Sequence, residues 1–315
     1  MCDHCEAHAH SHGQGHGHGE PHAHHHAPAL ERRAQPDEFR VVVTGKGGVG
    51  KTSLTALLAR LLARDAWQVL ALDADPQMNL PYALGLPHDQ ARALTPLSQN
   101  PDYVEEKTGA RPSSGWGLFF RLNPDVADVV ERFGVTGPDG VRLLVMGNTV
   151  QPAAGCLCPE NTLLAAVANA VSLRRGEAIL LDTQAGVEHF GRALAHGFRH
   201  AVVVTDATFN GVQVALHAAR LARDLGIPAL HLVVNRVRGG RDEAHVREIL
   251  AGEEPVAFTS MHFLPYDEFL LQSEPDVGPL LQHAASPLLA AIGELRDALL
   301  RHEASREAQP WQRAS

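Results

Sequence analysis

The chain has 315 residues, of which 44% are hydrophobic and 20% charged, and its net charge is −9 with histidine neutral. This length allows one large α/β domain or two small ones with a sizeable core. The acidic balance and the lack of a basic stripe argue against a nucleic-acid partner, because phosphate binding needs clustered Lys and Arg. No apolar run could span a bilayer and no secretory signal opens the chain, so we expect a cytoplasmic protein without a membrane partner.

Residues 1–37 differ in composition from everything that follows, since they are rich in His, Gly, Ala and Pro and nearly lack bulky apolar side chains. Such a segment cannot bury a core and is expected to be disordered. A second polar tail is expected at residues 303–315, which leaves residues 38–302 as the folded domain. The first segment holds candidate metal ligands, namely Cys2, His4, Cys5, His8, His10, His12, His16, His18, His22, His24, His25 and His26.

Neutral imidazole is a good ligand for Ni²⁺ and Zn²⁺, and a flexible chain can bring several imidazoles to one ion. The irregular spacing predicts capture of several weakly held ions rather than one defined site. A purification tag or a solvating tail would also be rich in His, but interruption by Gly, Ala, Gln and Glu argues against a tag. The Cys2-x-x-Cys5 pair could be a tighter first capture point, although this spacing alone is weak support.

From residue 39 onward, short apolar runs alternate with helical stretches. Apolar runs lie at residues 39–44, 68–72, 141–146, 178–181, 201–205 and 230–234, and helical stretches at 52–63, 162–173 and 213–224. This alternation predicts βαβ units, and hence a mainly parallel, doubly wound α/β sheet flanked by helices. Residues 90–139, which include Pro96, Pro101, Pro112 and Pro124, are expected to be a long insertion without a clean element.

A phosphate-binding loop follows the first apolar run and opens the first helix. It satisfies the pattern G-x-x-x-x-G-K-[ST], in which glycines let backbone N–H groups surround phosphate oxygens and the helix N-terminus adds partial positive charge. Lys51 is expected to contact the β- and γ-phosphates, and the Thr52 hydroxyl to hold Mg²⁺. The nucleotide-binding residues predicted here are Gly45, Lys46, Gly47, Gly48, Val49, Gly50, Lys51, Thr52 and Ser53.

Lys46, directly after the first glycine, gives the loop a second lysine. The resulting K-G-G-x-G-K-T sequence resembles the deviant Walker A motif of the MinD/ParA and nitrogenase-iron-protein group of P-loop proteins. That resemblance implies that Lys46 reaches across a homodimer to the partner's phosphates and neutralises charge in the transition state. The alternative is a solvated loop lysine.

The resemblance extends to the carboxylates that follow two apolar runs. Asp73 and Asp75 lie in a segment similar to the family's switch I, which implies that Asp73 orders Mg²⁺ and its waters and that Asp75 orients or deprotonates the attacking water. Asp182 ends an apolar run as a Walker B aspartate does and is expected to help hold Mg²⁺, and Gly186 is placed to sense the γ-phosphate. A carboxylate at a strand end can also be a simple helix cap.

ATP is favoured over GTP by the residues after the run at 230–234. Guanine-binding sites of the N-K-x-D type have a carboxylate where Arg238 stands, whereas Asn235 can still meet the adenine amino group. The segment around Pro265 resembles the adenine-flanking loop of the same group. ATP and Mg²⁺ are therefore the expected cofactors.

Cys156 and Cys158 form a C-x-C pair, so all four cysteines of the chain occur in two close pairs. Two thiolates cannot complete a tetrahedral or square-planar site, but a symmetric dimer would supply the other two. A metal site shared between subunits is the favoured interpretation. Two buried thiols or a redox pair are the alternatives.

The segment Gly155–Asn161 around these cysteines, together with Asp182–His189, resembles the CooC family. Those ATPases assist nickel insertion into carbon monoxide dehydrogenase and bind metal through paired cysteines at the dimer interface. The resemblance covers roughly residues 39–300 and implies a nickel client enzyme as partner, and Thr183-Gln184 departs from the more acidic sequence expected there. The tail resembles that of HypB-type nickel GTPases, although the body does not.

The predicted function is an ATP-dependent metallochaperone that binds Ni²⁺, or Zn²⁺, and supports its insertion into a client metalloenzyme by nucleotide-gated dimerisation. An iron–sulfur cluster carrier of the ApbC type is an alternative, which C-x-C spacing and the histidine tail disfavour. A ParA/MinD-like positioning ATPase is a second alternative. It would leave the cysteines unexplained, and the amphipathic segment 288–300 carries few basic residues for a lipid surface.

Overall fold

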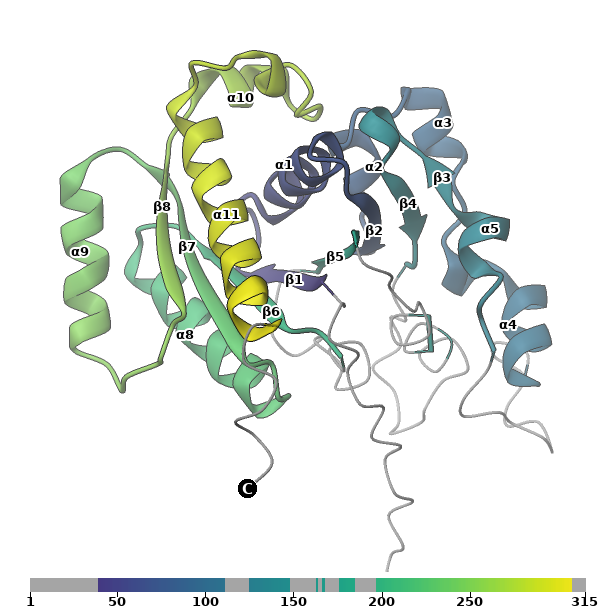
Figure 1. Ribbon diagram of the computed structural model, residues 1–315, viewed down its shortest axis with the longest axis horizontal. Coiled ribbons are helices and arrows are strands. Elements are labelled where there is room, and N and C mark those ends of the chain that lie inside the picture. The colour runs from purple at the N-terminus through teal and green to yellow at the C-terminus, as the bar shows by residue number, and fades with distance from the viewer. Residues whose placement is uncertain are drawn as a thin grey trace, which may run out of the picture. The chain divides into compact units, whose positions relative to one another are not determined.

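The computed structural model describes residues 39–110, 125–147, 163, 166–167, 176–184 and 197–307. Their centre is an eight-stranded sheet with the order β3-β4-β2-β5-β1-β6-β7-β8 (Figure 1). Every neighbouring pair is parallel except β3 and β4. The mainly parallel α/β sheet predicted from the alternating pattern is therefore confirmed.

The strands are short. Two of them, β1 and β6, are buried along their whole length, and β2, β4, β5 and β7 are buried along most of it. Buried strands of this kind read as continuous apolar runs because helices cover both faces of a parallel sheet. Their bounds are β1 Phe39–Gly45, β2 Gln68–Ala74, β3 Val135–Thr136, β4 Arg142–Val145, β5 Glu177–Thr183, β6 His200–Thr205, β7 Ala229–Val237 and β8 Ser260–Pro265.

The helices connect the strands and also form a group of short elements between β2 and β4. The α-helices are α1 Lys51–Arg64, α2 Leu80–Ala83, α3 His88–Ala93, α4 Pro101–Thr108, α5 Val129–Phe133, α8 Phe209–Asp224, α9 Gly240–Ala251, α10 Glu268–Ser273 and α11 Pro287–Glu307, and the 3₁₀ helices are η1 Leu97–Gln99, η2 Pro138–Gly140 and η3 Leu280–Gln282. No helix of this described part is long and apolar enough to cross a bilayer.

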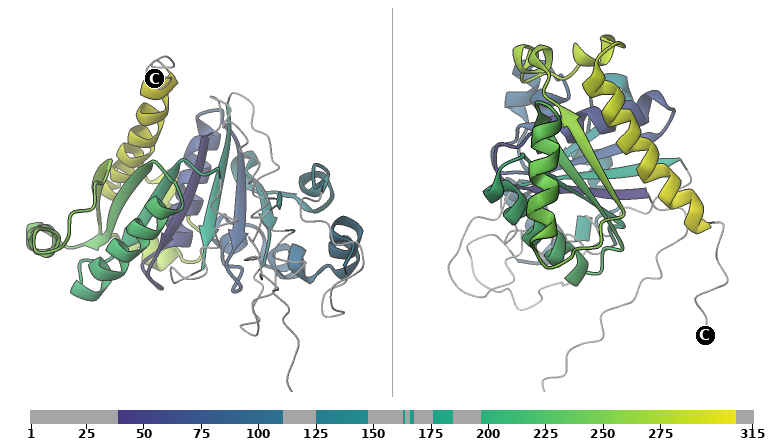
Figure 2. Two further views of the ribbon diagram at one scale, coloured as in Figure 1. Left: turned by 90° about the horizontal axis from the view of Figure 1, so that it is seen from below. Right: turned by 90° about the vertical axis from the view of Figure 1, so that its left-hand side faces the viewer.

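Two hydrophobic cores lie on the two faces of the sheet, and helices flank both faces (Figure 2). One face is covered by α4, α5, α8 and α9, and the other by α1, α2 and α11. In β5, Leu181 belongs to the first core and Leu180 to the second, because successive side chains of a strand point to opposite faces. The doubly wound arrangement is thus confirmed.

Three expectations about helices were wrong. Helix α8 begins at Phe209 rather than Gln213, because the Thr208 side chain caps it by accepting a bond from the Gly211 N–H. Residues 90–139 contain short helices, including α4 and α5, instead of an irregular insertion. Helix α11 continues through Glu307, and Glu303 is 9% exposed, so the polar tail expected from residue 303 begins inside a helix.

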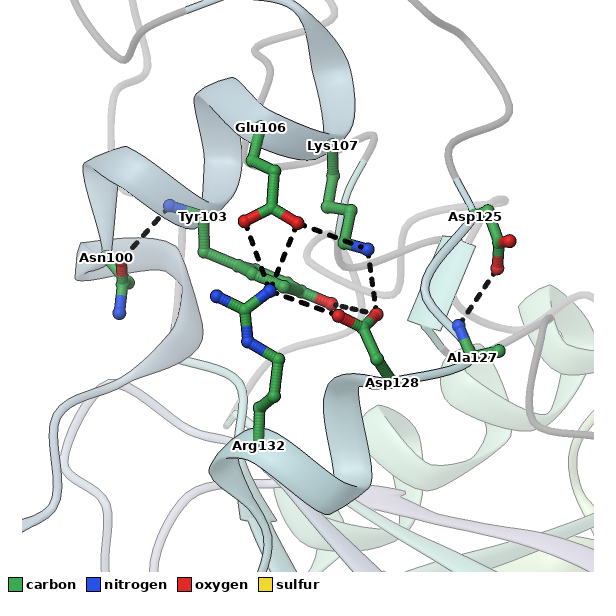
Figure 3. Close-up of polar contacts among 8 residues, drawn as sticks. All are labelled: Asn100, Tyr103, Glu106, Lys107, Asp125, Ala127, Asp128 and Arg132. Atoms are coloured by element: carbon green, nitrogen blue, oxygen red, sulfur yellow. Dashed lines mark hydrogen bonds and ion pairs between the residues drawn. The ribbon is translucent and has the colours of Figure 1, made fainter.

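Helices α4 and α5 are joined by a polar cluster around the buried Tyr103 (Figure 3). The Tyr103 hydroxyl donates to Asp128 Oδ1 at 3.1 Å, and Lys107 Nζ lies 2.8 Å from the same oxygen. Arg132 Nη1 donates to Asp128 Oδ2 and to Glu106 Oε1, each at 3.1 Å. Short helices such as α4 and α5 bury little apolar surface against each other. Charged side chains above and beside the Tyr103 ring hold the two helices together instead.

Candidate functional site

The phosphate loop leaves β1 in a conformation that only glycine tolerates well. Gly45, Gly48 and Gly50 have φ values of 137°, 74° and 92°. A Cβ on Gly45 would lie 2.0 Å from the Val204 carbonyl oxygen of β6, so the loop is pressed against the neighbouring strand. Gly50 directly precedes α1, whose first-turn N–H groups consequently face the loop.

Lys51 is the first residue of α1 and is 6% exposed. Its Nζ donates a 3.0 Å hydrogen bond to the Lys46 carbonyl oxygen, which folds the side chain back over the loop. Burial lowers the pKa of Lys51, and the charges of Asp182 and Asp75 partly offset that effect. The site therefore has one buried ammonium group held by the loop backbone, an arrangement suited to a phosphate oxygen.

Two carboxylates lie side by side at the carboxyl ends of β2 and β5. Asp73 and Asp182 are paired in register, and both are fully buried. Burial raises the pKa of Asp182 to about 7 and raises that of Asp73 well above its usual range. The charge of Asp182 adds to the rise in the pKa of Asp73, and the charge of Asp75 adds to the rise in both. Two buried acids this close favour a cation between or beside them.

The residues near Asp182 fit a Mg²⁺ ion. Oδ2 of Asp182 is buried without a hydrogen-bond partner among the described residues, while its carboxylate accepts bonds from the Thr52 and Thr55 hydroxyls. By contrast, both oxygens of Asp73 accept backbone N–H groups, from Asp75 at 3.0 Å and Leu80 at 3.2 Å. Hard oxygen ligands of this kind suit Mg²⁺, which keeps several of its waters.

Asp75 is half-buried and stands just beyond β2. Its Oδ1 accepts the Gln77 N–H at 2.9 Å, which closes a tight turn directly after β2. The carboxylate is near enough to Asp73, Asp182 and Lys51 to affect the pKa of all three. The predicted acidic group is therefore part of the same charged cluster.

Lys46 does not take part in that cluster. Its Nζ lies 3.7 Å from Asp206 Oδ2, and the lysine side chain is 38% exposed. Asp206 follows β6 and also binds Thr208, the residue that caps α8. The second lysine of the loop thus points along the surface toward the start of α8.

Asn235, near the end of β7, connects this strand to the phosphate loop. Its Nδ2 donates to the Val49 carbonyl oxygen at 2.8 Å, and its Oδ1 accepts the Arg236 N–H at 2.9 Å. Pro265 ends β8, and the guanidinium of Arg238 lies 4.4 Å from the centre of the adjacent Tyr266 ring. These residues line the same edge of the sheet as the loop, where the base of a nucleotide would extend.

Several predicted residues lie outside the described residues. They are Gly186, Cys156, Cys158, and in the N-terminal segment Cys2, His4, Cys5, His8, His10, His12, His16, His18, His22, His24, His25 and His26.

Thr55 and Asp206 were missed at the level of sequence. Thr55 Oγ1 donates to the Lys51 carbonyl oxygen at 2.9 Å and to Asp182 Oδ1 at 3.4 Å, so it supports the Walker B carboxylate from α1. A buried polar residue inside the apolar face of a helix was the available signal. For Asp206, the signal was a carboxylate at a strand's carboxyl end, the same pattern that had indicated Asp73 and Asp182.

A glycine loop, a buried lysine and paired carboxylates at the carboxyl edge of a parallel sheet define a P-loop nucleoside triphosphatase. Residues 40–274 match the sequence family described as the CobQ/CobB/MinD/ParA nucleotide binding domain. The chain is 34% identical over 262 residues to the carbon monoxide dehydrogenase accessory protein CooC of Rhodospirillum rubrum, an alignment that covers 81% of this chain and 97% of that protein. It is also 35% identical over 236 residues to an uncharacterized ATP-binding protein of Methanocaldococcus jannaschii, covering 75% of this chain and 88% of that one.

The chain therefore belongs to the CobQ/CobB/MinD/ParA family of nucleotide-binding proteins, and within that family it is a CooC-type ATPase. Solved structures agree in fold. The cell division protein MinD of Aquifex aeolicus superposes with a TM-score of 0.58 at 20% identity, covering 84% of this chain and 97% of that one. A ParA family ATPase from Chlorobium tepidum gives 0.57 at 16% identity, with 82% and 98% covered.

Proposed function

We propose that this ATPase is a cytoplasmic metallochaperone that binds Ni²⁺ and supports its insertion into a client metalloenzyme. The supporting observation is the similarity to CooC along 97% of that protein's length, since its name states a role as accessory protein of carbon monoxide dehydrogenase. The client would be carbon monoxide dehydrogenase or another nickel enzyme. Zn²⁺ is the second candidate cargo because it shares the same ligands.

In the proposed nucleotide site, the phosphates of ATP lie in the loop from Gly45 to Ser53, where backbone N–H groups and Lys51 contact them. Thr52 and Asp182 hold Mg²⁺, and Asp73 orders its waters. The bound ion would neutralise charge that develops on the phosphate oxygens. The remaining assignments are Gly186 as γ-phosphate sensor and Asn235 and Pro265 at the adenine.

Asp75 is the proposed group that orients or deprotonates the attacking water. It lies at the mouth of the site rather than buried with Asp73 and Asp182, so solvent can reach it. A general base must stand within hydrogen-bond reach of the proton that it removes, and a short loop at the end of a strand allows this approach.

Lys46 is the proposed contact to a second subunit. In the single chain it is held by Asp206, an ion pair between two groups that are 38% and 30% exposed. Exposed pairs of this type contribute little free energy and are readily exchanged for a stronger partner such as a triphosphate. ATP would thus favour the homodimer by drawing Lys46 across the interface.

Cys156 and Cys158 are the proposed cargo ligands, with the matching pair of a second chain completing the site. The histidine-rich segment would collect ions for them. Hydrolysis would separate the subunits and release the metal to the client. This is a population shift, in which ATP must bind the closed dimer more tightly than the open form.

The experiment uses three proteins under anaerobic conditions with Ni²⁺: the full chain, a variant that starts at Gln35, and that variant with Cys156→Ser and Cys158→Ser. Molar mass and the thiolate-to-nickel charge-transfer absorption are recorded with ATP, with ADP and without nucleotide. We expect one thiolate-bound ion per dimer, a dimer favoured by ATP, and loss of the charge-transfer band in the double cysteine variant.

A Lys46→Gln variant is the test of the dimer contact, with Arg223→Gln, at an exposed residue of α8, as a control for the loss of a surface cation. Lys46→Gln should bind ATP but fail to dimerise and should hydrolyse ATP roughly 10³-fold more slowly, as expected for loss of a trans-acting cation. The absence of a charge-transfer band in every nucleotide state would refute the cysteine cargo site. A brown, iron-containing protein would instead favour the iron–sulfur carrier.

A further inference from the structure

A group of buried imidazoles lies far from the nucleotide site, at the amino ends of β6 and β7. His200 opens β6, His231 is in β7, and both are fully buried. Helix α11 brings His302 and Glu303 to the same place, where the His302 ring lies edge-on to His200 with centroids 5.3 Å apart. The phosphate loop follows the opposite, carboxyl end of the neighbouring strand β1.

A chain of hydrogen bonds orders these side chains. Glu303 Oε1 lies 2.9 Å from His200 Nε2, and His200 Nδ1 lies 3.0 Å from His231 Nε2. The chain continues from His231 Nδ1 to Ser260 Oγ at 2.7 Å and from there to His262 Nε2 at 2.8 Å. Glu303 Oε1 belongs to a carboxylate and only accepts, whereas every other link is a nitrogen or a hydroxyl that can donate or accept. The chain can therefore reverse direction by changing tautomers once His200 Nε2 no longer donates to Glu303.

Three of these side chains can present ligand atoms to one point. One atom each from His200, His302 and Glu303 lies within 4.8 Å of the other two. Ligands bonded to one transition metal at about 2.0–2.2 Å stand roughly 3–4 Å apart, so the group needs only a small closure. In addition, Nδ1 of His302 is buried and has no hydrogen-bond partner among the described residues, which leaves a polar atom unsatisfied.

We propose that His200, His302 and Glu303 form a binding site for a divalent transition-metal ion such as Ni²⁺, Zn²⁺ or Co²⁺. The site needs neither the cysteines nor a second subunit, so it is separate from the cargo site proposed above and does not depend on it. Two imidazole nitrogens and one carboxylate are a common ligand set for these ions, with remaining positions left for water or another ligand.

Arg199 indicates which class of metal ion this site favours. It is buried, and its Nε donates to Glu303 Oε1 at 2.9 Å, which already neutralises the carboxylate. An ion held mainly by negative charge, such as Mg²⁺ or Ca²⁺, would meet a neighbouring cation and too few oxygens. An ion that forms strong bonds to imidazole nitrogen keeps its affinity there.

His231 supplies the outer support that metal-bound histidines usually have. With a metal on Nε2, the His200 ring carries its proton on Nδ1 and donates it to His231 Nε2, the reverse of the direction toward Glu303. The hydrogen-bond chain is thus compatible with both the empty and the occupied site.

Strand β1, which follows the histidine-rich segment in the sequence, also packs against this site. Phe39, the first residue of β1, places its ring centroid 5.6 Å from that of His200.

The test uses the full-length chain with the ten tail histidines replaced by Asn and all four cysteines by Ser, which removes the predicted ligands of the tail and of the cysteine site. Binding of Ni²⁺ alone and Co²⁺ alone is measured by equilibrium dialysis, with Co²⁺ absorption and the metal-dependent rise in Tm as further readouts. We expect one ion per chain, Co²⁺ bands of nitrogen and oxygen ligation, and a higher Tm with metal.

His302→Ala in this background should weaken Ni²⁺ binding by about 100-fold or more, beyond the loss caused by an outer-shell residue, and abolish the Tm rise. His302→Gln is the second variant in case the alanine chain does not fold, and His217→Ala, on the exposed side of α8, is the matched control. No ion bound by the parent chain would overturn the proposal, as would equal binding in the His302 and His217 variants. The cysteine site is judged separately, by its charge-transfer band.

Discussion

The conformation of the phosphate loop at Gly45 requires a residue without a side chain. The residue has φ of 137°, and a Cβ would meet the backbone of β6, with the Val204 oxygen 2.0 Å and the Val204 nitrogen 3.1 Å away. Backbone atoms of a central strand cannot move aside as a flexible side chain can. Gly48 differs, because its φ is 74° but nothing lies within 4 Å of the Cβ position.

Gly45→Ala should therefore destabilise the nucleotide-free protein by more than about 3 kcal/mol, the upper range for strained backbone alone, because steric overlap is added to it. Gly48→Ala, the matched control, should cost about 1 kcal/mol from backbone conformation only. Urea unfolding without nucleotide checks both values. Similar losses in the two variants would show that contact with Val204 is not what fixes Gly45.

Among the elements, α4 and α5 are too short to be stable by themselves and depend on the Tyr103 cluster. Burial alone would raise the pKa of Asp128, but hydrogen bonds from Lys107, Arg132 and Tyr103 lower it to about 2. Burial and the neighbouring Asp128 charge raise the pKa of the Tyr103 hydroxyl, so this group stays protonated and remains a donor.

The cluster predicts a defined pH dependence. An unfolded aspartate has a pKa of about 3.9, so between that value and about 2 the unfolded chain binds more protons at Asp128 and stability rises with pH. Asp128→Asn should therefore be less stable than the parent above about pH 5, by about 1 kcal/mol after allowing for a side chain 34% exposed.

That difference between the two proteins should shrink as pH falls toward 2, where Asp128 becomes protonated. Urea unfolding of both chains across this range measures it. Asp89→Asn is the control, since Asp89 is an exposed residue outside the cluster. A parent-to-variant difference that stays constant down to low pH would contradict the assignment of the low pKa to Asp128.

For the whole molecule, the important feature is that one sheet separates two cores and is shared by both. Leu180 and Leu181 are neighbours in β5, are 0% and 1% exposed, and belong to different cores. Both faces of such a strand are buried, and both depend on the same hydrogen bonds to the neighbouring strands. Loss of packing on one face therefore weakens the structure that supports the other face.

Leu180→Ala and Leu181→Ala should each lower the free energy of unfolding by about 2–5 kcal/mol, and each should keep a single unfolding transition. Leu271→Ala, at a side chain 45% exposed in α10, should change it by less than about 1 kcal/mol. Differential scanning calorimetry gives both results. Two separated transitions in either core variant would show that the faces unfold independently.

The sequence alone determined the parts of this protein that are contiguous or that follow from strand ends. The residues from Gly45 to Thr52 form one loop because each contributes backbone or side chain locally. Asp73 and Asp182 could be predicted to lie close together because the carboxyl ends of parallel strands meet at one edge of a sheet. The observed register, in which these two residues are paired, confirms this prediction. The boundaries of α8 and α11 were missed because one cap and one buried ion pair outweigh local propensity.

Only the tertiary structure decided which distant residues meet. Lys46 faces Asp206, and His200 and His231 meet His302 and Glu303, because β6 lies between β1 and β7 and α11 returns along the sheet. Sequence patterns indicate the periodicity of apolar residues, the residues that favour turns, and the ends of strands. All of these are local features of the chain. Strand order and the return path of a helix arise from the packing of the whole chain, so contacts made across them have no local signature.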